Sequence, residues 1–427
     1  MKTCWGLGHT WVSGMRRSVG AWFFATVVPV IAALALTLTG VYTTAALAAE
    51  IVIGTTVSLS GPYEAASASQ FNGLALWSEF VNAEGGVLAG GERHPVRLVY
   101  YDDASDPANI PLLYERLIHH DNARFLMSAY SSAIGLAAAA VAEEHGKIII
   151  LPGSGADEIF ANGYESVYQI YAPSSRYFLP ALEVLALRSP GARVAFVYED
   201  DPFAVNAIVR AREFARGVGL EVVFDKAYPA AATEFGELVR ELETLGPVAV
   251  IGGGHLYDGI ALTKALAASG AQVRFLALLS APSFPEFAAI GDGAVGAIYP
   301  SQWEPGVEYR PTFGPTPAEF VRVYEERYGS TPDYYAASGF NAGLVLQHAL
   351  ERAGALDDAA VHEALDATDI VTFYGRVRFE TQPGGHGLQV GHEMLLVQLQ
   401  RGPGGSLVKE VVWPDDAKSG DLLFPKP

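Results

Sequence analysis

The sequence contains a single cysteine, Cys4, and none follows it. The remainder of the chain can therefore form no disulfide, no thiolate metal site and no cysteine nucleophile. A Cys directly after a leader would be the attachment point for a lipid, and none is present there either. These absences leave a chain whose stability and chemistry depend on packing, hydrogen bonds and ordinary charges.

Acidic residues are missing from the first 49 positions, where the basic residues are Lys2, Arg16 and Arg17 and no charge occurs from 18 to 49. Ala46 and Ala48 have the spacing of a small-x-small cleavage site. This layout predicts a signal peptide over residues 1–49, cut after Ala48 or Ala49, and export to a Gram-negative periplasm. An uncleaved anchor is the alternative, because the apolar run exceeds the ~20 residues that span a bilayer.

Basic residues are few throughout. The chain has 28 Lys and Arg against 47 Asp and Glu, a net charge of −19. Without the three basic residues of the leader, 25 remain against the same 47, a net charge near −22. Such a surface repels phosphate backbones and anionic lipids, so nucleic acid is excluded as a partner.

Short β-branched runs alternate with longer helical ones along the rest of the chain. The two successive sets predict an α/β fold with two doubly wound parallel-sheet lobes. In the first set, strands are expected at 51–57, 96–103, 124–130 and 147–153, with helices at 70–86, 106–120 and 132–146. In the second set, strands are expected at 193–201, 221–229, 248–254 and 273–280, with helices at 203–219, 234–246 and 257–270. Helices at 318–329 and 334–354 and strands at 375–380 and 392–400 follow a segment rich in proline and aromatic residues that begins near Tyr299.

Two glycine-rich turns invite a catalytic interpretation. "LPGSGAD" (151–157) lacks the outer glycines of the G-x-S-x-G nucleophile elbow, so Ser154 is not expected to be a nucleophile. "GGGHLYDG" (252–259) has neither G-x-G-x-x-G spacing nor a GK[ST] ending, so it predicts no nucleotide site. Both turns are better explained by the close approach of a ligand or of the other lobe.

His386 and His392, in "GGHGLQVGH", have no acidic or cysteine neighbour at metal-ligand spacing and are expected on a surface loop. No metal, no cofactor and no catalytic residue is expected. The strand-to-helix turns are instead rich in small hydroxyls and aromatics, as in "SGPYEAAS", "SAYSSAIG" and "YEDDPF". Ligands of open α/β sheets bind at the carboxyl ends of strands, where helix N-termini meet them.

Several segments of the sequence occur in the same order as in one known family of proteins. These segments are "IVIGTTVSLSGPYEAASASQFNGLALWSEFVNAEGGV", "VRLVYYDDASDP", "MSAYSSAIG…EEHG" and "TPDYYAASGFNAG". They resemble the type I periplasmic solute-binding proteins of ABC importers. More narrowly, they resemble the leucine/isoleucine/valine-binding group. The resemblance implies two lobes that close on a small-molecule ligand, and an ABC permease in the inner membrane as partner. It divides the chain into lobe 1 (50–171 and 302–373) and lobe 2 (172–301 and 374–427), and a monomer is expected.

The resemblance also carries over site residues and shows departures. The carboxylate-binding serine matches Ser131, but the family's threonine position is Gly155, next to Ser154. The second-lobe acid that holds an ammonium falls near Leu279, and two tyrosines become Phe203 and His255.

A buried ammonium without an anionic partner is costly, so the hypothesis is a less polar cargo: an aromatic or short aliphatic carboxylate, an amide or an alcohol. Glu199 or Asp258 would supply the charge if the register differs, which leaves amino acids open. The residues expected to bind the ligand are Tyr63, Tyr130, Ser131, Ser132, Gly153, Ser154, Phe203, His255 and Trp303.

Two other functions compete with import. The same cleft would serve a periplasmic ligand-sensing module that partners a membrane sensor. An exported hydrolase would need a convergent nucleophile, base and oxyanion hole, and Ser154→Ala would then abolish turnover.

Overall fold

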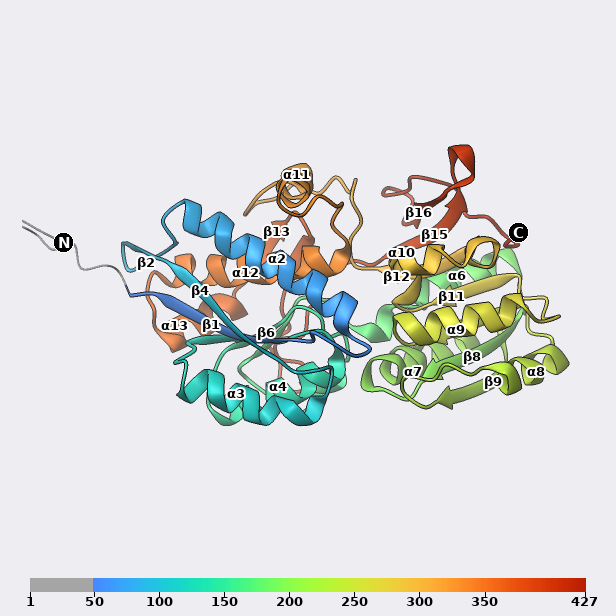
Figure 1. The fold of residues 1–427 in the computed structure, drawn as a ribbon, viewed down its shortest axis with the longest axis horizontal. Coiled ribbons are helices and arrows are strands. Elements are labelled where there is room, and N and C mark those ends of the chain that lie inside the picture. The colour runs from blue at the N-terminus through green and yellow to red at the C-terminus, as the bar shows by residue number, and fades with distance from the viewer. Residues whose placement is uncertain (1–48) are drawn as a thin grey trace, which may run out of the picture. The chain divides into compact units, whose positions relative to one another are not determined.

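The computed structural model describes residues 49–427 (Figure 1). The predicted signal peptide, with Cys4, therefore lies outside the described residues apart from Ala49. Within residues 49–427, no helix combines the length and the apolar character that a bilayer crossing requires.

The first sheet is built from parallel strands in the order β4-β1-β5-β6-β7. β1 (Ile51–Val57) pairs with β4 (Val96–Asp102) from Ile51↔Val96 to Val57↔Asp102. The other strands are β5 (Phe125–Met127), β6 (Ile149–Leu151) and β7 (Val167–Gln169). Every residue of these last three strands is buried, and all but Gln169 are hydrophobic, as expected for a parallel sheet with helices on both faces.

Helices cover both faces of this sheet (Figure 1). α2 (Glu64–Ala83) and α12 (Tyr334–Ala353) lie together on one face, and α3 (Ile110–His119) and α4 (Ser132–Glu144) on the other. A Cβ at Gly339 would come within 1.9 Å of the Gln70 carbonyl oxygen, and one at Gly73 within 1.8 Å of the Ala336 carbonyl oxygen. Glycines on both helices therefore allow their backbones to touch.

The first lobe also contains shorter elements. These are α5 (Glu158–Ala161), α11 (Pro317–Tyr328), α13 (Asp358–Asp366) and the hairpins β2 (Val87–Ala89) with β3 (Glu92–His94) and β13 (Asp369–Thr372) with β14 (Gly375–Arg378).

The second sheet has the order β16-β15-β12-β11-β10-β8-β9. Its strands are β8 (Arg193–Glu199), β9 (Glu221–Tyr228), β10 (Ala249–Gly253), β11 (Phe275–Leu278), β12 (Ala297–Ser301), β15 (Leu395–Arg401) and β16 (Leu407–Trp413). The pairs from β9 to β12 are parallel, and β15 and β16 add an antiparallel edge. The predicted α/β fold class with two parallel sheets is confirmed.

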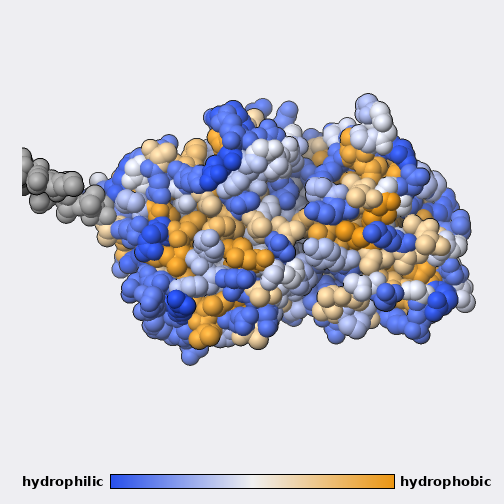
Figure 2. Space-filling view, in the orientation of Figure 1, coloured by the Kyte–Doolittle hydropathy of each residue, from blue (hydrophilic) through white to orange (hydrophobic). Residues whose placement is uncertain are grey.

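β8 shows how this sheet forms two cores. Val194 and Phe196 belong to one apolar cluster, whereas the alternate residues Ala195 and Val197 belong to another. Successive strand side chains point to opposite faces, so one strand contributes to both. The helices around these clusters are α6 (Leu179–Arg188), α7 (Pro202–Gly217), α8 (Gly236–Leu245), α9 (Leu256–Ala267) and α10 (Pro285–Ala288). Hydrophilic residues cover much of the face seen in Figure 2, with apolar patches between them.

Residues 374–391 pack with the first lobe, whereas β15 and β16 belong to the second sheet. Val377 and Phe379 belong to the apolar cluster around the first sheet, and the Gln169 backbone N–H of β7 donates to the Gly387 carbonyl oxygen at 2.9 Å. This packing favours a boundary between the lobes near residue 392, whereas the sequence analysis placed it after residue 373. The division into lobes by residue range stays a prediction.

Candidate ligand-binding site

Turns at the carboxyl ends of both sheets converge on one narrow cavity. The first sheet contributes the turns after β5, β6 and β7, and the second those after β8, β10 and β11. This is where open α/β sheets bind ligands. The lining residues are Tyr130, Ser131, Ser132, Gly153, Tyr171, Tyr177, Phe203, His255, Ser280 and Tyr334.

Two serines open α4 at this cavity. Ser131 is the N-cap residue, with extended backbone, yet its hydroxyl makes no cap bond and has no partner although it is fully buried. The Ser132 hydroxyl accepts from the backbone N–H groups of Gly155 and Ala156 at 3.0 and 3.1 Å. Its own proton remains available, because a hydroxyl both donates and accepts. The Ser132 hydroxyl therefore ties the turn after β6 to α4.

Ser154 faces away from the cavity. Its hydroxyl donates to the Ser131 carbonyl oxygen at 3.0 Å, and a Cβ at Gly135 of α4 would come within 1.9 Å of it. Ser154 is fully buried and absent from the lining. The Ser154 hydroxyl therefore stabilises the turn through the Ser131 carbonyl oxygen, whereas Gly153 lines the cavity.

Aromatic rings form the walls. Phe203 lies at the start of α7 with its ring 5.4 Å from that of Tyr177 and 5.9 Å from that of His255. Tyr63 does not line the cavity but packs behind it, 4.9 Å from the His255 ring. Trp303 lies in the first core, where its indole N–H donates to the Phe373 carbonyl oxygen at 3.1 Å. Tyr63 and Trp303 are thus not brought to the cavity surface.

The tyrosine hydroxyls differ in how they are satisfied. Tyr171 faces the cavity with a buried hydroxyl that has no partner. Tyr130, in the first lobe, shares hydrogen bonds with His255 Nδ1 at 2.9 Å and with the Ser280 hydroxyl at 3.2 Å, both in the second. Burial raises the pKa of Tyr130 and Tyr171 well above the usual value, so both keep a proton to donate.

Three carboxylates lie behind His255 on the side away from the cavity. Asp201 Oδ2 is 3.1 Å and Glu199 Oε2 3.7 Å from His255 Nε2, and the His255 backbone N–H donates to Asp258 Oδ1 at 2.8 Å. None of the three acids lines the cavity. Both ring nitrogens of His255 are therefore engaged by protein groups, so neither is free to hydrogen-bond a ligand.

The acids favour a positive charge on the His255 ring. Burial opposes a charge on His255, but the hydrogen bond to Asp201 and the charges of Asp201 and Glu199 outweigh it and raise the pKa of His255 to about 9. Burial raises the pKa of Glu199 to about 7 and also raises that of Asp258, while the charge on His255 counteracts both shifts.

Four lining residues were not expected from the sequence: Tyr171, Tyr177, Ser280 and Tyr334. Tyr171 and Tyr177 belong to "YAPSSRY", which was interpreted only as a crossing between lobes. Ser280 lies two residues after β11, so its place near a strand end was the available signal.

His392 also departs from expectation. It is buried, not on a surface loop: its ring stacks on Tyr374 at 4.8 Å, and its Nε2 lies 2.7 Å from the Gln302 carbonyl oxygen. His386 is partly buried, with Nε2 2.9 Å from Asp366 Oδ1.

Two α/β sheets whose strand ends enclose one small cavity define a two-lobed solute-binding protein. Residues 50–405 match the model of the family described as periplasmic binding protein, and the chain belongs to this family. The expected family is confirmed. Its members bind small-molecule ligands and work with ABC permeases, and membership implies a periplasmic location.

Individual relatives agree with this assignment. The chain is 26% identical over 391 residues to Leu/Ile/Val-binding protein homolog 7 of Brucella abortus (strain 2308), covering 88% of this chain and 95% of the relative. Among solved structures, a leucine-binding protein from Thermotoga maritima MSB8 is similar with a TM-score of 0.73 and 20% identity, covering 86% of this chain and 99% of that one. A solute-binding protein of an ABC transporter from R. palustris, in complex with benzoate, is similar with a TM-score of 0.70 and 21% identity, covering 88% and 97%.

Proposed function

We propose that this protein is the periplasmic receptor of an ABC importer and that its cargo is a small solute without an ammonium group. The cargo classes are an aromatic or short aliphatic carboxylate, an amide or an alcohol. The binding residues we propose are Tyr130, Ser131, Ser132, Gly153, Tyr171, Phe203 and His255, all of which line the cavity.

One observation carries this proposal: the cavity presents buried hydroxyls without partners and no carboxylate. Ser131 Oγ and Tyr171 OH are both buried, unpaired and part of the lining, and unpaired buried polar groups are costly unless a ligand satisfies them. A carboxylate, amide or alcohol oxygen accepts from both. The backbone N–H groups that begin α4 favour an anion at the same place.

An amino acid cargo fits less well. Its ammonium needs an anionic partner, yet the acids beside His255, Asp201 and Glu199, lie outside the lining. The aromatic walls around Phe203 and Tyr177 suit an apolar body. The cavity between these walls is narrow, which favours a small cargo.

The relatives support both the role and the choice of cargo to test. A receptor from R. palustris was solved with benzoate and another with 4-hydroxybenzoate, whereas a Streptococcus pneumoniae relative was solved with isoleucine. The receptor we propose is exported by a leader over residues 1–49, acts as a monomer and catalyses no turnover.

A thermal-shift screen of the protein without its leader, from Glu50, tests the cargo class. The panel contains benzoates, short aliphatic carboxylates, amides, alcohols and branched-chain amino acids. A ligand at 100 times its dissociation constant adds about 2.7 kcal/mol of stability, which is enough to raise the Tm measurably. Stabilisation by compounds without an amino group is expected. Stabilisation by leucine or valine alone would overturn the cargo assignment but leave the receptor role intact.

A further inference from the structure

Three metal-donor atoms converge in the second lobe beside the cavity. Glu199 Oε2, Asp201 Oδ2 and His255 Nε2 all lie within 4.8 Å of one another. The three residues are only 4–6% exposed. Glu199 ends β8, Asp201 is the N-cap residue of α7, and His255 precedes α9, so adjacent strands β8 and β10 bring them together.

Each of these side chains is anchored by its other polar atom. The Ala231 backbone N–H donates to Glu199 Oε1 at 2.8 Å, and the Ala204 backbone N–H donates to Asp201 Oδ1 at 2.8 Å. His255 Nδ1 is held by the Tyr130 hydroxyl at 2.9 Å. Outer hydrogen bonds of this kind orient the ligands of metal sites and leave one donor atom of each side chain facing the ion.

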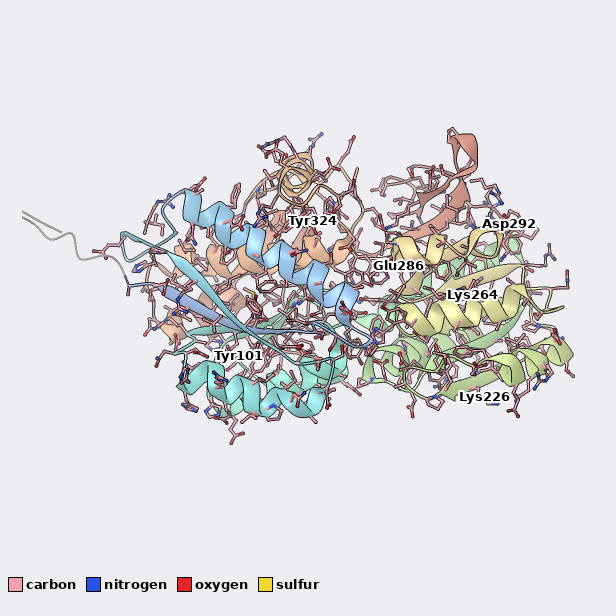
Figure 3. The ribbon with its side chains drawn as sticks, in the orientation of Figure 1. Tyr101, Lys226, Lys264, Glu286, Asp292 and Tyr324 are labelled. Carbon is pink, nitrogen blue, oxygen red and sulfur yellow. The ribbon has the colours of Figure 1, made fainter. Side chains whose placement is uncertain are left out.

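One proton on His255 Nε2 cannot hydrogen-bond to both the Asp201 and the Glu199 carboxylates. A single hydrogen on His255 Nε2 serves Asp201 at 3.1 Å, and Glu199 Oε2, at 3.7 Å, is left buried with no hydrogen-bond partner. Within residues 49–427, His255 is the only ion-pair partner of either acid. Lys226 of β9 and Lys264 of α9 are exposed on the outer surface of this lobe (Figure 3) and do not neutralise it.

We propose that Glu199, Asp201 and His255 form a Zn²⁺ site in the second lobe. Tetrahedral zinc at about 2.0–2.2 Å from nitrogen and oxygen ligands places neighbouring donors roughly 3.4 Å apart, and the two distances from Nε2, 3.1 and 3.7 Å, bracket that value. One imidazole and two carboxylates satisfy three positions with one ion, and the fourth is open to water.

Gly254 explains part of the glycine-rich turn that the sequence left unassigned. A Cβ at this position would lie 2.1 Å from Glu199 Oε2 and 2.9 Å from Asp258 Oδ2. Only glycine leaves the Glu199 carboxylate in place beside His255. The proposed ion goes beyond the receptor role, because it depends on no cargo.

The experiment titrates the chelator-treated protein with ZnCl₂ by calorimetry and follows the Tm in parallel. We expect one tight site per chain and a rise in Tm on adding zinc. Glu199→Gln and Asp201→Asn keep the anchoring acceptor oxygen and remove one anionic donor. Each is expected to weaken zinc binding about a hundredfold or more, and Tyr130→Phe, which removes only the outer bond to His255, about tenfold.

The control is a second cluster on the first lobe, where Glu115 contacts His119 and His145 at 3.1 and 2.7 Å and the His119 side chain is 61% exposed. His119→Ala should leave the tight site unchanged. A Tm of Glu199→Gln in chelator equal to or above that of the wild type shows that this variant folds. Zinc affinity and Tm response that survive both Glu199→Gln and Asp201→Asn, or that disappear in His119→Ala, would overturn the proposal and leave an imidazolium held by Asp201.

Discussion

At the scale of single residues, the Ser131 hydroxyl is the polar group whose surroundings most clearly indicate a ligand. It is 1% exposed, has no hydrogen-bond partner and lines the cavity at the first turn of α4. Ser128, three residues earlier, also has a buried hydroxyl without a partner but does not line the cavity. The pair separates an effect on binding from an effect on stability.

Ser131→Ala is expected to weaken cargo binding at least tenfold, because a hydrogen bond to a charged group contributes about 1.5–3 kcal/mol. Ser128→Ala should leave the affinity unchanged. Calorimetric titration of both variants with the best compound of the thermal-shift screen measures the difference. Equal affinities for the two variants would exclude Ser131 from the contact.

His392 gives a prediction about acid stability. Burial lowers the pKa of His392 to about 4, although the Gln302 carbonyl oxygen opposes this shift. The unfolded chain, in which histidine titrates near 6.5, therefore binds a proton at higher pH than the folded chain. The stability that neutral His392 confers is complete above pH ~6.5, decreases as the pH falls towards 4 and changes no further below that. The full effect is at most about 3 kcal/mol.

Chemical denaturation from pH 4 to pH 7 tests this. His392→Gln should lose less stability than the wild type as the pH is lowered through this window. His120→Gln, at a side chain that is 72% exposed, is the control and should follow the wild type. A wild type and His392→Gln with parallel pH profiles would contradict the assignment.

At the scale of elements, the contact between α2 and α12 depends on glycine. A Cβ at Gly339 would meet the Gln70 carbonyl oxygen at 1.9 Å, and backbone in a packed helix pair has little room to move. Gly217, the last residue of α7, is also helical but has no atom within 4 Å of an added Cβ.

Gly339→Ala is expected to destabilise the protein by about 1–3 kcal/mol through overpacking. Gly217→Ala is expected to be neutral or to stabilise by up to about 1 kcal/mol, because alanine is the better helix former. Urea denaturation of the two variants compares them directly. A urea midpoint for Gly339→Ala equal to or higher than that for Gly217→Ala would mean that α2 and α12 move apart without loss of stability.

At this scale the sequence predicted much of the fold. The expected strands at 51–57 and 96–103 correspond to β1 and β4, and the expected helix at 334–354 to α12. It missed β7 and α6. β7 has three residues, too few for a period-two pattern. α6 has a helix-start signal, Pro180 in its first turn, that the prediction did not use.

At the scale of the whole molecule, Tyr130 joins the lobes. Its hydroxyl, on the turn after β5, reaches His255 at 2.9 Å and Ser280 at 3.2 Å, both on turns of the second sheet. The bonds exist only while the two sets of strand ends face one another, so they stabilise the closed cavity.

Tyr130→Phe should therefore speed cargo release about fivefold, the kinetic equivalent of ~1 kcal/mol for one hydrogen bond. Tyr114→Phe is the control, because the Tyr114 hydroxyl donates to the Met127 carbonyl oxygen within the first lobe. Stopped-flow displacement of bound cargo measures both rates. An unchanged rate in Tyr130→Phe would remove this bond from the closure.

The sequence by itself determined the alternation of strands and helices, and therefore two sheets whose carboxyl-end turns, rich in Ser, Gly and aromatic residues, form a ligand site. Only the tertiary structure decided which side chains face the cavity. Ser131 and Ser154 both lie in turns that follow a strand of the first sheet, yet Ser154 turns to the Ser131 carbonyl oxygen because Gly135 of α4 leaves room for it. Glu199 and His255 are 56 positions apart and meet because β8 and β10 are neighbours in the sheet. The direction of a side chain at a turn depends on atoms distant in the sequence, which local pattern does not encode.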